Sequence, residues 1–263
     1  MNSALVEIIW QSRKVHLEYS WVGNQKATSP LMVFLHEGLG SVAMWRDFPE
    51  RLCGVLNCRG LVYSRPGYGR STPRAPDEHW PSRFMHQQAI EVLPSLLAAL
   101  QVDTAEHPPW IFGHSDGGSI ALLYAAHDPS RCAGVIALAP HLFVEPIAIA
   151  GISQARQAYL NADLRQRLAG FHDNPDSAFW GWNNVWLDPG FQDWSIEESL
   201  GKISCPILAI QGIEDEYGTL EQIRRIAQRV PQTVLLELAD CRHSPHRDQP
   251  AQVIAAVHRF VHP

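Results

Sequence analysis

Gly113-His114-Ser115-Asp116-Gly117-Gly118 is the stretch from which the rest of the chain can be placed. The apolar residues 109–112 before it are typical of a buried strand, and residues 119–127 after it repeat apolar side chains at helical spacing. Small residues two positions before and after a serine permit a sharp strand-to-helix turn with an exposed hydroxyl. The helix N-terminus at that turn also favours a developing negative charge. The pattern predicts that Ser115 is a nucleophile.

The composition is that of a globular protein with a large core, since 46% of the 263 residues are hydrophobic and 18% are charged. This length fits one large α/β domain or a domain that carries an insertion. The net charge of −6, without a basic stripe, argues against nucleic acid as a partner. No apolar run approaches the ~20 residues that span a bilayer, so we expect no membrane association.

The five cysteines are scattered and form neither a CxxC pair nor a cluster with histidines. We therefore expect free thiols in a reducing compartment and no metal site. The first residues lack the basic and apolar regions of a signal peptide. These features predict a cytoplasmic protein that uses no metal or other cofactor.

Strand and helix patterns alternate along most of the chain. Residues 4–10 and 15–22 are expected to form an antiparallel hairpin. Strands are predicted at 30–36, 60–63, 109–112, 133–138, 206–210 and 233–238, and helices around Met44–Leu52 and at 83–101, 119–127, 219–229 and 249–261. This order predicts an α/β fold with a mostly parallel central sheet flanked by helices. Ligand sites in such sheets form beyond the carboxyl ends of the strands.

The alternation stops between residues 140 and 202, where helical patterns near 147–160 and 162–170 precede an aromatic segment. We therefore predict a core of residues 1–139 and 203–263 and an inserted helical cap of residues 140–202. Four of the nine tryptophans lie within fifteen residues, 180–194. They form the core of the cap or line an apolar pocket, and the sequence leaves both readings open. The pocket candidates here are His141, Glu145, Trp182 and Trp186.

Five motifs together resemble those of the α/β-hydrolase-fold serine hydrolases, over nearly the whole chain. H-E-G-L-G-S at 36–41 resembles the oxyanion turn of that family, and R-P-G-Y-G-R-S at 65–71 resembles its arginine loop. G-H-S-D-G-G resembles its nucleophile elbow, G-I-E-D at 212–215 its acid turn, and R-H-S-P at 242–245 its histidine turn. The resemblance implies a capped, cofactor-independent enzyme. Carried over by position, it implies Ser115 as nucleophile, Asp215 as acid, His243 as base, and the backbone N–H groups of Gly38 and Asp116 as oxyanion hole.

The acid and the base each have neighbours in the sequence that could serve the same role. Glu214 and Glu216 flank Asp215, and His246 follows His243, but the motif spacing favours Asp215 and His243. The remaining histidines, His114 included, are expected to serve packing, capping or solvent contact. His36 is expected to orient the oxyanion turn.

The sequence departs from the family pattern at Ser64, which stands where an aspartate often precedes the arginine, and at two carboxylates near the oxyanion hole. These are Glu37 and Asp116. Negative charge there opposes the charge that the site must stabilise. Either both carboxylates point away, or one of them binds a cationic or hydroxylated group of the substrate. Glu37 is therefore a further pocket candidate.

The first functional hypothesis is a serine hydrolase that cleaves a small ester, thioester or lactone with an apolar or aromatic moiety through an acyl-enzyme. The first alternative is a carbon–carbon bond hydrolase acting on a ketonic intermediate of aromatic degradation. The second is a non-catalytic ligand receptor. The partner in each case is a small molecule.

Overall fold

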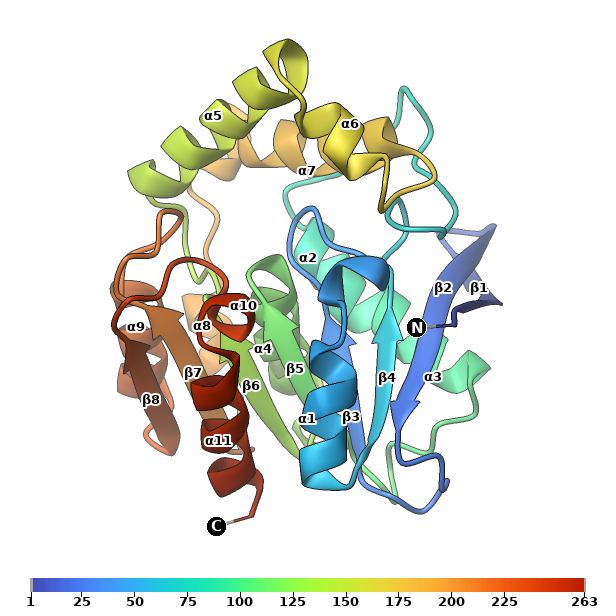
Figure 1. Cartoon of the computed structure of the whole chain (residues 1–263), viewed down its shortest axis with the longest axis vertical. Coiled ribbons are helices and arrows are strands. Elements are labelled where there is room, and N and C mark those ends of the chain that lie inside the picture. Colours follow the sequence, from blue (N-terminus) through green and yellow to red (C-terminus); the bar gives the residue numbers. More distant parts are fainter. Residues whose placement is uncertain (1, 263) are drawn as a thin grey trace.

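The computed structural model describes residues 2–262, and an eight-stranded sheet forms its centre (Figure 1). The strand order is β1-β2-β4-β3-β5-β6-β7-β8. The strands are β1 (Ala4–Trp10), β2 (Arg13–Gly23), β3 (Leu31–Leu35), β4 (Arg59–Tyr63), β5 (Trp110–His114), β6 (Gly134–Leu138), β7 (Ile207–Gly212) and β8 (Thr233–Leu238). β1 and β2 form the expected antiparallel hairpin, β2 pairs antiparallel with β4, and all other neighbours are parallel. The predicted mostly parallel sheet is confirmed.

Both faces of the central strands are buried because helices cover both. On β3, Val33 and Leu35 belong to one apolar cluster, and Met32 and Phe34 belong to another on the opposite face. This alternation follows from the two-residue period of a strand. It explains why the central strands are continuous apolar runs rather than alternating ones.

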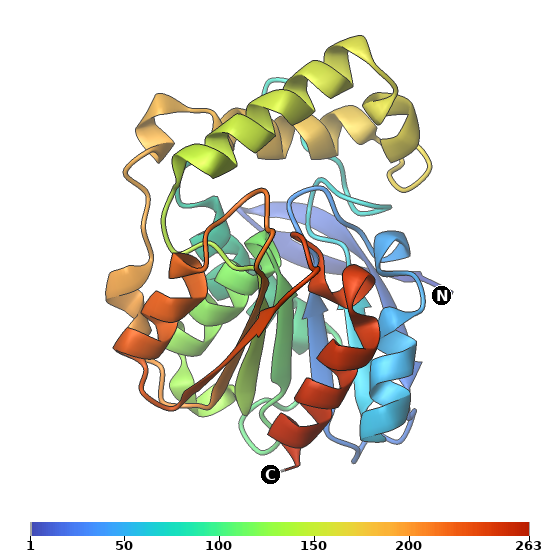
Figure 2. The same ribbon diagram turned by 60° about the vertical axis from the view of Figure 1, so that its left-hand side comes forward.

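The helices divide between the two faces. The first face carries α1 (Phe48–Leu56) and α11 (Pro250–Val261), which contact each other (Figure 2). The second face carries α2 (Phe84–Gln87), a π-helical turn (Gln88–Val92), α3 (Leu93–Ala99), α4 (Asp116–His127), α8 (Glu197–Leu200) and α9 (Glu221–Arg229). Residues 116–126 of α4 are all buried, so the helix that follows Ser115 lies in the centre of the fold. A rigid helix therefore supports the serine.

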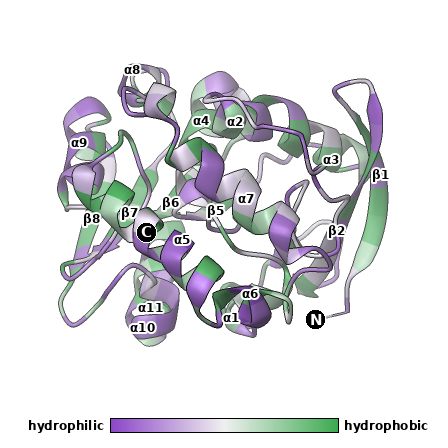
Figure 3. Ribbon diagram, turned by 90° about the horizontal axis from the view of Figure 1, so that it is seen from above, coloured by the Kyte–Doolittle hydropathy of each residue, from purple (hydrophilic) through white to green (hydrophobic). Residues whose placement is uncertain are grey.

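The chain between β6 and β7 forms helices that lie beyond the carboxyl ends of the parallel strands (Figure 1). They are α5 (Pro146–Asn161), α6 (Leu164–Leu168) and α7 (Pro175–Trp186). Seen from above, α5 and α7 cross the region of β5, β6 and β7, and α5 carries both hydrophilic and hydrophobic residues along its length (Figure 3). These helices therefore face the edge of the sheet where ligands bind in such folds.

Three local predictions differ from the structure. The helix expected around Met44 begins only at Phe48, after a separate 3-10 turn (Ala43–Trp45) that buries Trp45. The helix predicted at 83–101 contains a π-helical turn just before Pro94, because proline supplies no N–H for the regular ladder. The aromatic segment was predicted without helix bounds, and its part up to Trp186 forms α7. Pro175 occupies the first helical position, and the Asn174 side chain caps the helix by accepting from the Ser177 N–H.

Candidate active site

The predicted sharp turn joins β5 to α4 at Ser115. Ser115 has φ 54° and ψ −120°, a conformation that a non-glycine residue seldom adopts. A Cβ atom on Gly113 would collide with the backbone of Gly117, and a Cβ atom on Gly117 would collide with the Leu35 carbonyl. Both positions therefore require glycine, and the strained turn presents the Ser115 hydroxyl beyond the sheet.

Two side chains from later turns meet Ser115. His243 lies between β8 and the short helix α10 (Pro245–Asp248), and its Nε2 is 2.9 Å from Ser115 Oγ. Its Nδ1 is 2.8 Å from Oδ1 of Asp215, which follows β7. Because a carboxylate accepts hydrogen bonds, Nδ1 carries the proton and Nε2 is free to accept from the serine hydroxyl. The arrangement is that of a nucleophile, a base and an orienting carboxylate.

The Asp215 carboxylate is held in place by its own donors. The Tyr217 N–H donates to Oδ1 at 2.8 Å, and Gln211 Nε2 donates to Oδ2 at 3.1 Å. Burial alone would raise the pKa of Asp215, but the hydrogen bond and charge of His243 lower it below its usual value. Burial likewise works against the cationic form of His243, yet Asp215 outweighs it and raises the pKa of His243. The pair therefore stabilises an imidazolium at the position where one would form.

The rival residues of the same type are engaged elsewhere. Glu214 accepts a hydrogen bond from the Cys241 N–H at 2.9 Å, and Glu216 accepts one from the His243 N–H at 3.1 Å. The His246 ring packs against Trp45, with centroids 4.9 Å apart. The motif spacing thus selected the residues that the structure brings together.

The turn after β3 places a second set of groups beside the serine. Within residues 2–262, the backbone N–H groups of Gly38 and Asp116 donate to no protein acceptor. His36 fixes this turn, because its Nε2 accepts from the Arg65 N–H at 3.0 Å and its Nδ1 donates to the Glu37 carbonyl at 2.7 Å. These two bonds require the neutral ring, and burial accordingly lowers the pKa of His36 well below its usual value. The two free donors are available for an oxyanion.

The two unexpected carboxylates have protein partners. Asp116 accepts from Trp186 Nε1 at 3.2 Å, and its Oδ2 lies 3.6 Å from Arg65 Nη1. Glu37 Oε2 lies 3.6 Å from His114 Nδ1, and Oε1 lies 3.9 Å from Arg247 Nη2. Burial raises the pKa of Asp116, whereas for Glu37 the opposing effect of His114 and Arg247 outweighs burial and lowers the pKa. Glu37 is thus ionised and directed toward His114 and Arg247.

A cavity of about 170 Å³ opens above Ser115. Four of the five pocket candidates line it: Glu37, His141, Trp182 and Trp186. Trp182 covers Gly38 so closely that a Cβ atom there would collide with the indole ring. His141 Nε2 lies 3.5 Å from Ser115 Oγ, and burial with the nearby His243 lowers the pKa of His141 to about 3. The ring is therefore a neutral polar group in a largely apolar wall.

The fifth candidate, Glu145, is wrong as a pocket residue. Its Oε2 accepts hydrogen bonds from the Thr219 N–H at 2.9 Å and from Gln222 Nε2 at 2.7 Å. The carboxylate thus accepts hydrogen bonds from groups at the N-terminal end of α9 and does not line the cavity. Its position just after β6 made it a candidate, but the chain turns away before it reaches the site.

Five further residues line the cavity without having been predicted as pocket residues: Leu39, His114, Ile152, Tyr217 and Ser244. Leu39, His114 and Ser244 lie inside or next to the recognised motifs, so their sequence position was a usable signal. Tyr217 follows the acid turn by two residues, and its ring centroid is 4.8 Å from that of His243. Ile152 lies on α5, and no sequence pattern distinguishes it from the other apolar residues of that helix.

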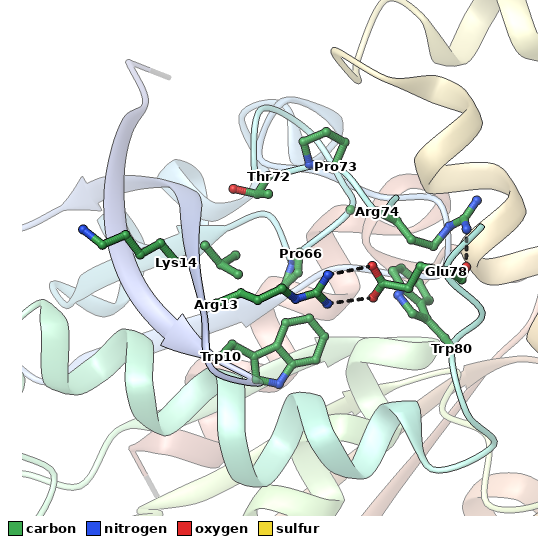
Figure 4. A pocket seen from close by; sticks show the side chains of 11 residues that line it. Trp10, Arg13, Lys14, Pro66, Thr72, Pro73, Arg74, Glu78 and Trp80 are labelled. Carbon is green, nitrogen blue, oxygen red and sulfur yellow. Dashed lines mark hydrogen bonds and ion pairs between the residues drawn. The ribbon is translucent and has the colours of Figure 1, made fainter. Parts of the chain in front are cut away.

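The arginines after β4 do not reach this cavity. Arg65 donates to the Glu37 carbonyl at 2.8 Å, and Arg74 donates to the Ala75 carbonyl at 2.7 Å. Arg74 lines a separate cleft of about 60 Å³ between β2 and the 66–80 loop, where Arg13 is paired with Glu78 (Figure 4). The Arg65 and Arg74 guanidinium groups thus bind protein carbonyls. The described lining of the cavity at Ser115 contains no arginine or lysine.

Within residues 2–262, no group of three or more histidine, cysteine, aspartate or glutamate side chains is placed to hold a metal ion. The helices of the same range all fall short of the length and apolar character needed to cross a bilayer.

The fold is similar to that of several solved structures. A carboxylesterase from the thaumarchaeon Nitrososphaera gargenis is 18% identical with a TM-score of 0.77, over 97% of both chains. A thermophilic esterase from Thermogutta terrifontis is 18% identical with a TM-score of 0.75, over 100% of this chain and 98% of the other. The enol-lactonase from Burkholderia xenovorans LB400 is 22% identical with a TM-score of 0.72, over 95% of this chain and 97% of the other.

At these identities the likeness shows the fold alone. No curated protein sequence matches the chain. A model of the alpha/beta hydrolase family matches residues 32–257. The match begins within β3 and includes all of β4 to β8 and every motif described above. The chain therefore belongs to the alpha/beta hydrolase family.

Proposed function

We propose that this protein is a serine hydrolase that cleaves a small ester, thioester or lactone through an acyl-enzyme. The observation that carries the proposal is the continuous contact from Ser115 Oγ to His243 Nε2 at 2.9 Å and from His243 Nδ1 to Asp215 at 2.8 Å. The strained turn at Ser115 supports it, because such strain is kept where a nucleophile must be exposed. The fold shared with esterases and an enol-lactonase is consistent with this chemistry.

In the proposed mechanism, Ser115 Oγ attacks the substrate carbonyl while His243 Nε2 takes the hydroxyl proton. The carbonyl oxygen becomes an oxyanion that accepts hydrogen bonds from the Gly38 and Asp116 N–H groups. His243 then gives its proton to the leaving group, and the acyl group remains on Ser115. A water molecule, deprotonated by the same histidine, attacks the acyl-enzyme and releases the acid.

The size and lining of the cavity support a small acyl group. A volume of about 170 Å³ is below the range of about 300–1,000 Å³ common for ligand pockets. The tryptophan rings and Ile152 offer an apolar surface, and the lining includes two carboxylates but no arginine or lysine. A carboxylate on the acyl group would find no cation to bind it. An uncharged apolar or aromatic moiety fits this wall.

α5, α6 and α7 are proposed to act as a cap over the site, with residues 140–202 as the cap segment and residues 1–139 and 203–263 as the core; α8, near the end of the same segment, packs against α4 and α9. Trp182, Trp186 and Ile152 from this segment line the cavity, which supports that division. We also propose the cytoplasm as the compartment. All five cysteines are buried and free, and this is typical of reducing compartments.

The test is a substrate panel run on wild type and Ser115→Ala. It contains p-nitrophenyl esters of graded acyl size, acyl thioesters, lactones and ring-cleavage diketones. We expect turnover of small apolar or aromatic acyl compounds, and Ser115→Ala should lower kcat by roughly 10⁴–10⁶-fold, as loss of a nucleophile does. A fluorophosphonate probe should label wild type and leave the variant unlabelled.

Other outcomes identify the alternatives. Turnover of the diketones alone would favour the carbon–carbon bond hydrolase. Saturable binding of panel compounds without any turnover would favour a receptor. Labelling that persists in Ser115→Ala would show that another serine is the nucleophile.

A further inference from the structure

The backbone of His243 is held from both sides by side chains. Its N–H donates to Glu216 Oε2 at 3.1 Å, and its carbonyl accepts a hydrogen bond from His114 Nε2 at 2.7 Å. The His114 contact is the shorter one. His114 is the last residue of β5, immediately before Ser115. The strand that carries the nucleophile thus also holds the loop that carries the base.

This loop has no regular structure of its own at His243, because β8 ends at Leu238 and α10 begins at Pro245. The distance between Nε2 and Ser115 Oγ therefore depends on how the backbone of the loop is fixed. A displacement of about 1 Å in a reacting group can reduce a rate by about 10²-fold. A buried anchor on the carbonyl of His243 acts directly on that distance.

The His114 ring also connects this anchor to Glu37. A carbonyl oxygen only accepts hydrogen bonds, so His114 Nε2 must carry a proton. The other nitrogen, Nδ1, has no hydrogen-bond partner within residues 2–262 and faces the Glu37 carboxylate at 3.6 Å. The His114 side chain is only 1% exposed. The ring thus lies between the His243 carbonyl and the Glu37 carboxylate.

We propose that His114 is a positioning residue for catalysis: it fixes the carbonyl of His243 and is itself held by Glu37. Glu37 belongs to the turn that carries the Gly38 N–H, so one chain of contacts links the oxyanion turn, the nucleophile strand and the base. The inference rests on the proposed function, in which His243 is the base. His114 does not touch the reacting atoms and acts only through His243.

The experiment compares His114→Phe with His114→Gln. Phenylalanine fills the space but offers no donor, whereas the glutamine amide reaches about as far as imidazole Nε2 and can donate to the same carbonyl. The measurements are kcat and KM on a p-nitrophenyl ester, the rate of fluorophosphonate labelling of Ser115, and Tm. We expect His114→Phe to lower kcat and the labelling rate by about 10²-fold. KM should stay within about threefold, and His114→Gln should recover activity to within about tenfold of wild type.

His246→Phe is the matched control. His246 is also a buried imidazole, 4.8 Å from the His114 ring between centroids, but it packs on Trp45 and Phe48 and makes no contact with the His243 carbonyl. We expect its kcat to stay within about threefold of wild type, since no reacting group depends on it. If His114→Phe does not fold, His114→Asn replaces it, because the shorter amide does not reach the carbonyl.

Two results would overturn the inference. In the first, His114→Phe keeps kcat within threefold of wild type. In the second, its activity falls only as far as its folded fraction, and glutamine restores nothing; His114 would then be a packing residue. Failure of the proposed function itself looks different, because His243→Ala would then retain activity.

Discussion

The cavity at Ser115 has two sides. The strand side consists of the turns at the carboxyl ends of the strands, and the helix side consists of the helices above them. Different kinds of contact hold the two sides in place. On the strand side, Ser115, His243 and Asp215 are connected by hydrogen bonds of 2.8–2.9 Å. On the helix side the contacts are between rings: Tyr159 and Phe179 stack at 3.7 Å between centroids, and Trp186 meets Phe191 at 5.0 Å. Hydrogen bonds fix direction, whereas packed rings fix shape. The strand side is therefore suited to chemistry and the helix side to selection of the acyl group.

Polar contacts also join the two sides. His172, between α6 and α7, accepts from the Gly69 N–H and donates to the Leu39 carbonyl, both at 2.9 Å. These bonds require the neutral ring, and burial lowers the pKa of His172. Trp186 reaches down to Asp116 beside the nucleophile. Substitutions can test whether the division between chemistry and selection holds.

The largest effect is expected on the strand side. His243→Ala should lower kcat about as far as Ser115→Ala, roughly 10⁴–10⁶-fold, because the two residues act as a unit. His246→Ala should cost less than about tenfold in kcat, since that ring touches aromatic side chains and not the serine. Steady-state kinetics on the best ester of the panel measures both. A reversed order would mean that His246 is the base.

On the helix side, Trp182→Ala should change the preference among acyl groups and should not abolish activity. The ring lines the cavity above Gly38, so its removal should favour larger acyl groups by about 10–100-fold in relative kcat/KM. Trp194→Ala is the control, because Trp194 is buried against Phe191 but does not line the cavity. It should lower Tm and leave the preference as in wild type. A large fall in Tm with unchanged preference for Trp182→Ala would instead make Trp182 part of the helix packing only.

The smallest effect on kcat is expected from a substitution in the oxyanion turn, at Glu37. Glu37→Gln should leave kcat on a neutral ester within about threefold and reduce stability by roughly 1–2 kcal/mol, the usual range for a lost charged contact. Glu37 contributes to the raised pKa of His243, after the larger contribution of Asp215. The base acts in its neutral form, so activity falls as pH drops through this pKa. Removing the Glu37 charge lowers the pKa of His243 and shifts the acid limb of the kcat/KM profile to lower pH.

A pH profile of wild type and Glu37→Gln, with thermal unfolding of both, measures these effects. A kcat gain above tenfold on neutral esters would contradict the expectation. It would mean that the carboxylate faces the oxyanion instead of His114 and Arg247.

The sequence predicted those parts of the molecule whose local residue pattern is compatible with only one backbone structure. The five apolar residues of β3 fit a strand buried on both faces, and Gly113 and Gly117 fit only a turn with no room for Cβ. The roles of Ser115, Asp215 and His243 were implied by the resemblance of their turn motifs to those of the α/β-hydrolase family. Each of these motifs is only a few residues long.

The remaining features depend on contacts between distant segments. Trp182 and Trp186 line the cavity whereas Trp194 does not, although all three belong to one aromatic segment. Glu145 was misplaced because its partners, Thr219 and Gln222, are more than seventy residues away in sequence. Asn174 and Pro175 carry the capping signal of α7, but aromatic residues are not confined to one side of this helix, so its sequence shows no clear apolar repeat of helical period.

The long connection between β6 and β7 has a consequence for synthesis on the ribosome. A nascent chain that has emerged only as far as β6 leaves the outer edge of that strand unpaired until β7 arrives, after residues 139–206. Closing so long a connection slows folding, and an open strand edge is a site of aggregation. We therefore expect chains truncated within this connection to depend on chaperones. Asp215 and His243 follow it in sequence, so on the proposed roles no translation intermediate that ends before them activates Ser115.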